Sequence, residues 1–287
     1  MNVLVRAALW MTGAIASFSC MAIAGRELAS AYDTFEIMLY RSAVGVIVVV
    51  GLIALGGRWS EIRFDQMGRH LLRNLLHFTG QNLWFYAVAV VPLAQVFALE
   101  FTSPLWVAVL APVLLGERMT RIRAVAALLG FVGILVVARP SVDTFQIGLL
   151  TAAAAALFFA LTNMMTKRLT RDNTITSILF FLTTLQLLFG ALAAGYDGDV
   201  AGPTVQSLPY LVLVGLAGLL AHFCLTKALS IAPATIVVPL DFARLPVIAI
   251  VAMALYGEPL EVWVFVGAII IFIANYLNIW SETRNRT

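Results

Sequence analysis

Long apolar segments recur along the chain and are separated by short polar joints. Hydropathy and helix breakers together place ten such segments, each near or above the ~20 residues that a helix needs to cross ~30 Å of hydrocarbon. The pattern predicts an all-α membrane protein of ten transmembrane helices, with no joint long enough to form a domain. The predicted spans are 5–24, 34–55, 69–90, 93–114, 121–138, 146–166, 175–194, 207–230, 234–256 and 261–280.

Composition and charge agree with this class and give an orientation. Hydrophobic residues make up 62% of the chain and charged residues 11%, against ~25% charged in soluble domains. Basic residues concentrate in the joints after the second, fourth and sixth spans, so the positive-inside rule predicts cytoplasmic termini in a bacterial-type inner membrane. Because topology accounts for these charges, we expect the lipid bilayer and no nucleic acid as a partner. The first span, ending in Ala22-Ile23-Ala24, also imitates a signal peptide.

The second half of the chain repeats the first at a constant offset, which carries Pro92 onto Pro233 and Glu100 onto Asp241. Residues 86–117 and 227–258 are identical at ten of 32 positions without a gap, including a Gly-Glu pair at the end of each stretch. This repeat offset places the fourth span on the ninth, so the unit contains five helices. An odd number of spans reverses direction, which predicts two inverted repeats with a substrate site near the middle of the membrane.

The repeat and the "LLGE" and "LYGE" endings carry a family resemblance. The whole chain resembles the drug/metabolite transporter superfamily in its EamA-type branch, and within it the YddG-type exporters of aromatic amino acids. The resemblance implies one membrane bundle made of two five-helix repeats, residues 1–141 and 142–287. It also implies a secondary transporter of small metabolites.

Polar side chains in the third span are the first candidates for a substrate site. His77, Gln81 and Trp84 share one helix face, and the repeat offset carries Gln81 onto His222 in the eighth span. A polar stripe with aromatic neighbours suits a small amphipathic ligand, whereas the alternative is a seam of interhelical hydrogen bonds. The full candidate set for substrate binding is His77, Phe78, Gln81, Asn82, Trp84, Trp106, Asn163 and His222.

Charges and prolines at membrane depth form a second candidate set, for gating or charge pairing. Glu100 and Asp241 are equivalent by the repeat and are candidate proton or ammonium sites. Their alternative role is ion pairing, Asp241 with Arg244 one turn away and Glu100 with Arg41 at a similar depth. Pro239 and Pro246 predict a bent ninth helix.

These observations favour a carrier of aromatic or other neutral amino acids that works by alternating access. The alternative hypothesis is a proton-coupled drug or cation exporter that uses Glu100 or Asp241. No nucleophile, P-loop, metal-ligand or cofactor motif occurs, so we expect neither an enzyme nor a bound cofactor or metal. The expected partner is a small-molecule substrate, and the sequence is compatible with a monomer.

Overall fold

A computed structural model describes residues 3–115, 121–139, 147–196, 198–232, 237 and 240–284, and within these ranges the chain is helical without strands. The elements are α1 (Val3–Leu28), α2 (Thr34–Gly56), η1 (Trp59–Glu61), α3 (Met67–Val90), α4 (Leu93–Glu100), α5 (Ser103–Leu115), α6 (Arg121–Ala138), α7 (Ile147–Leu169), α8 (Ile175–Ala194), α9 (Leu208–Ile231), η2 (Asp241–Ala243), α11 (Arg244–Tyr256) and α12 (Val262–Arg284).

Helix boundaries follow the same repeat offset as the sequence. Four helix pairs begin at positions that this offset makes equivalent: α2 and α8, α3 and α9, α5 and α11, and α6 and α12. The caps repeat as well, because the side chains of Asp33 and Thr174 accept the N–H groups that open α2 and α8. Gly57 and Gly198 follow these helices with positive φ angles of 61° and 77°. The repeat is therefore a property of the backbone as well as of residue types.

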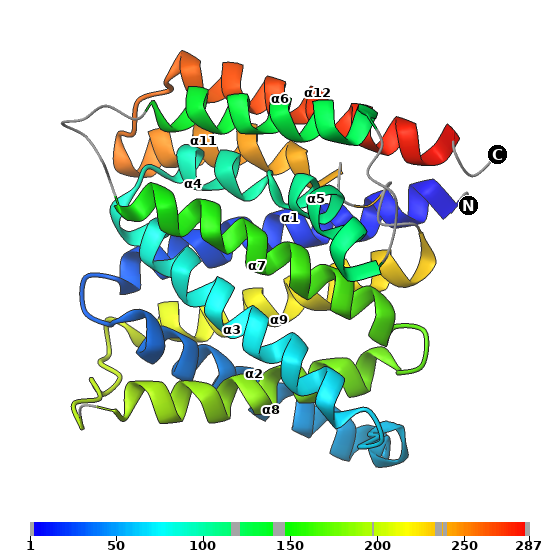
Figure 1. Ribbon diagram of the computed structural model, residues 1–287. Helices are drawn as coiled ribbons and strands as arrows, with labels where there is room; N and C mark the ends of the chain where they lie inside the picture. The colour runs from blue at the N-terminus through cyan, green and yellow to red at the C-terminus, as the bar shows by residue number, and fades with distance from the viewer. Residues whose placement is uncertain are drawn as a thin grey trace.

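Helices of one repeat pack against helices of the other in the pattern expected of two repeats related by a two-fold axis (Figure 1). The first helix of each repeat packs on the third helix of the other, as α1 does on α9 and α7 on α3. The remaining pairs, α2 with α8 and α6 with α12, lie at opposite edges of the bundle. Near the axis, the equivalent rings of Phe101 and Phe242 contact each other with centroids 4.8 Å apart.

The fourth span is interrupted in the middle, which differs from a single bent helix. It ends as α4 at Glu100 and restarts as α5 at Ser103, and the equivalent restart at Arg244 opens α11. Pro104 and Pro246 lie in the first turns of α5 and α11, where a proline leaves no hydrogen bond unmade. These prolines begin new helices instead of bending continuous ones, and Pro239 lies outside the described residues.

Among the described residues, five helices are long and apolar enough to cross a membrane, namely α1, α2, α7, α8 and α9. Shorter apolar helices cover Leu93–Val107, Ala124–Val137 and Val262–Leu277. Helix α3 is as long as these five but carries the polar stripe. The start of α1 and the end of α12 lie at the same end of the bundle (Figure 1), which agrees with termini on one side of a membrane.

Candidate functional site

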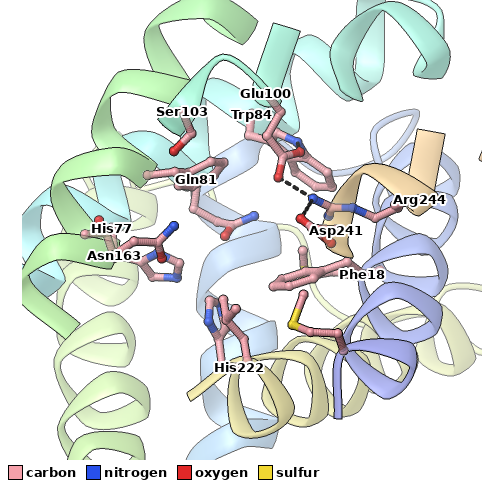
Figure 2. A pocket seen from close by; sticks show the side chains of 15 residues that line it. Phe18, His77, Gln81, Trp84, Glu100, Ser103, Asn163, His222, Asp241 and Arg244 are labelled. Atoms are coloured by element: carbon pink, nitrogen blue, oxygen red, sulfur yellow. Dashed lines mark hydrogen bonds and ion pairs between the residues drawn. The ribbon is translucent and has the colours of Figure 1, made fainter. Parts of the chain in front are cut away.

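A central cavity lies between the two repeats and encloses about 650 Å³, part of it open to solvent (Figure 2). Most of its lining residues form pairs that the repeat offset makes equivalent in the two repeats. The cavity is therefore built around the pseudo-two-fold axis. The pairs are Phe18 and Phe159, Met21 and Thr162, Gln81 and His222, Trp84 and Leu225, Glu100 and Asp241, and Ser103 and Arg244; Met11, His77 and Asn163 complete the lining.

Arg244 joins the two acidic residues of the cavity across the repeats (Figure 2). Its Nη2 donates to Glu100 Oε1 at 2.7 Å and to Asp241 Oδ2 at 2.6 Å. The Arg244 side chain is buried and its guanidinium lies 4.9 Å from the centre of the Phe18 ring. Trp84 Nε1 donates to the second oxygen of Glu100 at 2.9 Å. These two ion pairs of Arg244, which we call the Arg244 bridge, hold the interrupted fourth and ninth spans against each other.

The Arg244 bridge leaves the cavity wall with more carboxylates than cations. One guanidinium serves both Glu100 and Asp241, and Asp241 Oδ1 is buried without a hydrogen-bond partner among the described residues. A buried acceptor without a donor is unfavourable by ~1–3 kcal/mol. A proton or a cationic group of a ligand would satisfy this oxygen.

His77 and Gln81 of the polar stripe of α3 line the cavity and form no side-chain hydrogen bond to other helices in the described part of the chain, whereas Trp84 binds Glu100. The rings of His77 and His222 meet edge to face with centroids 4.7 Å apart. Both ring nitrogens of His77, His222 Nε2 and Gln81 Nε2 are buried without a hydrogen bond in the described part of the chain. An interhelical seam would satisfy such groups, so this geometry favours ligand contacts over a seam.

Some candidates do not line the cavity. Phe78 stacks on Phe35 with ring centroids 6.2 Å apart, and Asn82 donates to the carbonyl of Phe78 within its own helix at 2.8 Å. Trp106 and Pro246 are also absent from the lining. The predicted pairing of Arg41 with Glu100 is wrong, because Glu100 binds Arg244. Equal depth in a membrane does not fix which way a helix face points.

Several lining residues were not predicted, although the repeat already indicated their positions. Phe18 and Phe159 are aromatic at equivalent positions, and Met21 and Thr162 lie one turn later. Ser103 is the equivalent of Arg244. Ser103 already lies within the aligned stretch, and extending the repeat offset beyond that stretch would have found the other four.

A second cluster closes one end of the bundle, which we name the Arg26 end. Arg26 Nε donates to the carbonyl of Val88 at 2.8 Å and Nη2 donates to that of Val91, while Nη1 pairs with Glu258 Oε1. The other oxygen of Glu258 accepts the N–H of Leu93, at the start of α4, at 2.8 Å. Glu258, from the Gly-Glu pair of the second repeat, thus binds the first repeat at two points.

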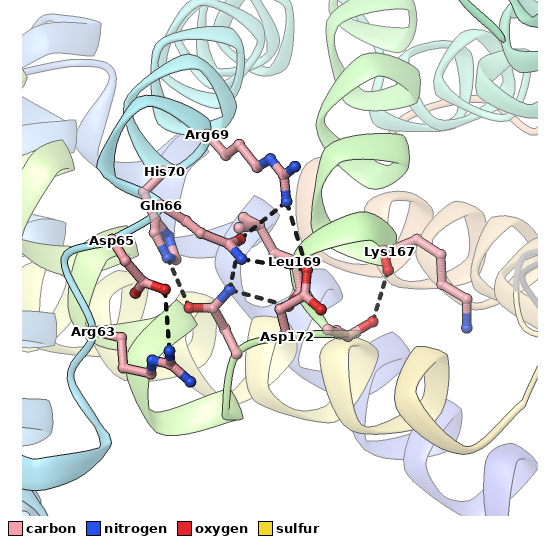
Figure 3. Close-up of polar contacts among 10 residues, drawn as sticks. Arg63, Asp65, Gln66, Arg69, His70, Lys167, Leu169 and Asp172 are labelled. Atoms are coloured by element: carbon pink, nitrogen blue, oxygen red, sulfur yellow. Dashed lines mark hydrogen bonds and ion pairs between the residues drawn. The ribbon is translucent and has the colours of Figure 1, made fainter.

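The opposite end, which we name the Lys167 end, has more exposed contacts (Figure 3). Lys167 Nζ donates to the carbonyl of Leu229 at 2.6 Å. The start of α3 meets the joint between α7 and α8 through Gln66, whose side chain contacts Asn173 at 3.1 Å and Asp172 at 3.3 Å. Asp172 is exposed and Gln66 is half-buried, so we expect the contact between them to contribute little stability.

Comparison with known proteins gives one consistent class. The model of the EamA-like transporter family matches twice, over residues 5–139 and 146–280. The chain is 29% identical to a riboflavin transporter of Vibrio cholerae, covering 97% of this chain and 95% of that protein. It is 27% identical to an S-adenosylmethionine uptake transporter of Rickettsia bellii, covering 96% and 94%. A solved structure described only as a protein shares the fold, with a TM-score of 0.67 at 18% identity over 98% of this chain and 99% of the other.

Proposed function

The chain belongs to the EamA-like transporter family, and from this premise we propose that it is a secondary carrier that moves a small metabolite through the central cavity by alternating access. The observation that carries the proposal is the pairing of lining residues at equivalent positions of the two repeats. A site on the axis of an inverted repeat keeps equivalent walls when the two halves exchange conformations. The positive-inside rule places the Arg26 end outside an inner membrane and both termini in the cytoplasm.

The cavity wall favours a substrate with a flat aromatic ring and a cationic or hydrogen-bonding group. Phe18, Trp84 and Phe159 offer ring faces and edges for stacking. Gln81 and the two histidines offer unmatched polar groups, and Asp241 offers a free carboxylate oxygen. Riboflavin and S-adenosylmethionine both contain a flat nitrogen heterocycle, and we propose a substrate of this class. The relatives do not support the narrower prediction of an aromatic amino-acid exporter, which we keep as one arm of the test.

Counterflow in proteoliposomes tests the substrate class. Vesicles loaded in turn with riboflavin, S-adenosylmethionine or tryptophan are supplied with a trace of the same labelled compound outside. We expect accumulation of at least one heterocyclic compound, and Trp84→Ala to reduce it ~10-fold because ~1–1.5 kcal/mol of aromatic contact is lost. Leu128→Ala, at an exposed position of α6, is the matched control with unchanged transport. Accumulation of none of the three compounds would contradict the substrate class.

A proton-coupled exporter of cations is the second candidate function, and the free oxygen of Asp241 favours it. In this case Asp241 exchanges a proton for the cationic group of the substrate. An imposed pH gradient should then drive accumulation of a cationic drug, and Asp241→Asn should remove the effect of the gradient while counterflow continues. Accumulation that is independent of the gradient in the wild-type protein would exclude this candidate.

A further inference from the structure

Two arginines are buried in the first repeat without a carboxylate. Arg41 of α2 is 5% exposed and Arg73 of α3 is 2% exposed. Within the described residues neither arginine forms an ion pair, and the like charges of Arg41 and Arg73 repel each other. A charged side chain within a membrane is unfavourable unless it is paired. The structure therefore contains a positive charge that requires compensation.

Arg41 borders a pocket between α2, α8 and α9, with about 230 Å³ of empty space. Its only hydrogen bond in the described residues is a long one of 3.9 Å from Nη1 to the sulfur of Met38. Arg41 Nε and Ser42 Oγ are buried and have no hydrogen-bond partner in the part of the chain that the structure describes. The lining residues are Arg41, Ser42, Gly45, Leu182, Thr183, Gln186, Gly215 and Leu219.

A glycine makes room for the guanidinium. A Cβ atom at Gly218 would lie 2.5 Å from Arg41 Nε, which is too close for any other residue unless Arg41 moves. The backbone of α9 is thus shaped to accept the charged group, and packing does not explain why the group is there.

A polar chain extends from this pocket to Arg73. Gln186 Nε2 donates to the carbonyl of Asn74 at 2.7 Å, and Asn74 Oδ1 accepts from Arg73 Nη1 at 2.8 Å. Thr166 Oγ1 accepts from Arg73 Nε at 3.1 Å. The amides and the hydroxyl satisfy hydrogen bonds of Arg73 but neutralise neither charge.

The second repeat has no counterpart of these charges. The positions equivalent to Arg41 and Arg73 are Leu182 and Val214, which are both buried. The fold therefore packs well with apolar residues at these places. Two buried arginines in one repeat alone point to a ligand of that repeat.

We propose that the pocket beside Arg41 binds a small monovalent anion, either inorganic chloride or the carboxylate of a small acid. The guanidinium Nε–H and the hydroxyl of Ser42 would donate to it. The pocket shares no lining residue with the central cavity and is much smaller, so it suits a single small ion and not a metabolite. The charges of Arg41 and Arg73 act on both His77 and His222, so a bound anion would also offset them at the cavity wall. This assignment is independent of which substrate the cavity carries.

Thermal unfolding of the purified full chain in nanodiscs tests the site, with gluconate as an anion too large to enter. At constant ionic strength, we expect chloride or acetate to raise the wild-type melting temperature on the order of 3–5 °C above gluconate. Ser42→Ala, which removes a donor and keeps the charge, should weaken the response. Arg41→Gln should abolish it, while Arg58→Gln at an exposed joint should leave it intact.

The two anions distinguish the sources of the ligand. A response to chloride identifies an inorganic ion, and a response to acetate alone identifies a carboxylate. Should Arg41→Gln fold too poorly for measurement, the Ser42→Ala response decides. Equal melting temperatures in all three salts for the wild type, or an undiminished response in Ser42→Ala and Arg41→Gln, would overturn the proposal.

Discussion

Arg26 and Lys167 occupy equivalent positions in the two repeats, near the ends of helices α1 and α7. Each donates to an equivalent carbonyl on the third helix of its own repeat, Val88 at 2.8 Å and Leu229 at 2.6 Å. Only Arg26, however, also binds the other repeat within the described residues, through Glu258. The contact within each repeat is thus shared by the two ends. A bridge between repeats is described at the Arg26 end, whereas Glu117, the residue equivalent to Glu258, lies outside the described residues.

This difference indicates which contacts change during transport. A contact within one repeat moves with that repeat as a body, whereas a bridge between repeats must break for the cavity to open at that end. Arg26 and Glu258 are 16% and 14% exposed, so their pairing is worth more than that of an exposed surface pair. We therefore expect the structure to represent a state closed at the Arg26 end.

Arg26→Ala should have the largest effect on this end. It removes the ion pair with Glu258 and two donors to the carbonyls of Val88 and Val91, a loss of about 3 kcal/mol. Hydrogen exchange at the amide of Leu93, which depends on closure, should accelerate ~100-fold. An unchanged rate would show that the bridge does not hold the end closed.

Glu258→Gln should have an intermediate effect. The amide oxygen still accepts from Leu93 or Arg26, but the attraction between opposite charges is lost, and we expect about 1.5 kcal/mol and ~10-fold faster exchange at Leu93. Combining it with Arg26→Gln gives a double-mutant cycle. Additive effects of the two changes would contradict a direct coupling between these residues.

Lys167→Ala should have the smallest effect. It removes one hydrogen bond, to Leu229, from a partly exposed side chain, and we expect a loss of about 0.5–1 kcal/mol. Exchange at the end of α9 should rise less than ~5-fold, and exchange at Leu93 should not change. A larger effect than that of Arg26→Ala would reverse the comparison between the ends.

The sequence was sufficient for the all-helical class and for most of the described helices, and it indicated several residues that line the cavity. Hydropathy located the helices, and the repeat offset alone paired Glu100 with Asp241 and Gln81 with His222. These predictions succeed because they depend on period and internal similarity. Eight candidates line one cavity: His77, Gln81, Trp84, Glu100, Asn163, His222, Asp241 and Arg244.

The failures concern contacts between distant residues. The ion-pair partner of Glu100 depends on the direction in which its helix face points. Depth in the membrane alone suggested Arg41, whereas the partner is Arg244. Arg26 and Glu258 are 232 residues apart, and no local pattern connects them. The interruption of the ninth span was expected as a bend, because prolines indicate a weakness in a helix without showing whether it continues.

Side-selective labelling of the cavity tests alternating access most directly. A single cysteine is placed at Ser103 after replacing Cys20 and Cys224, and a membrane-impermeant thiol reagent is added to right-side-out or inside-out vesicles. We predict fast labelling in inside-out vesicles and at least ~10-fold slower labelling in right-side-out vesicles, with Glu258→Gln raising the slow rate. Equal labelling from both sides in the wild type, or faster labelling from the Arg26 end, would contradict a carrier closed by the Arg26–Glu258 bridge.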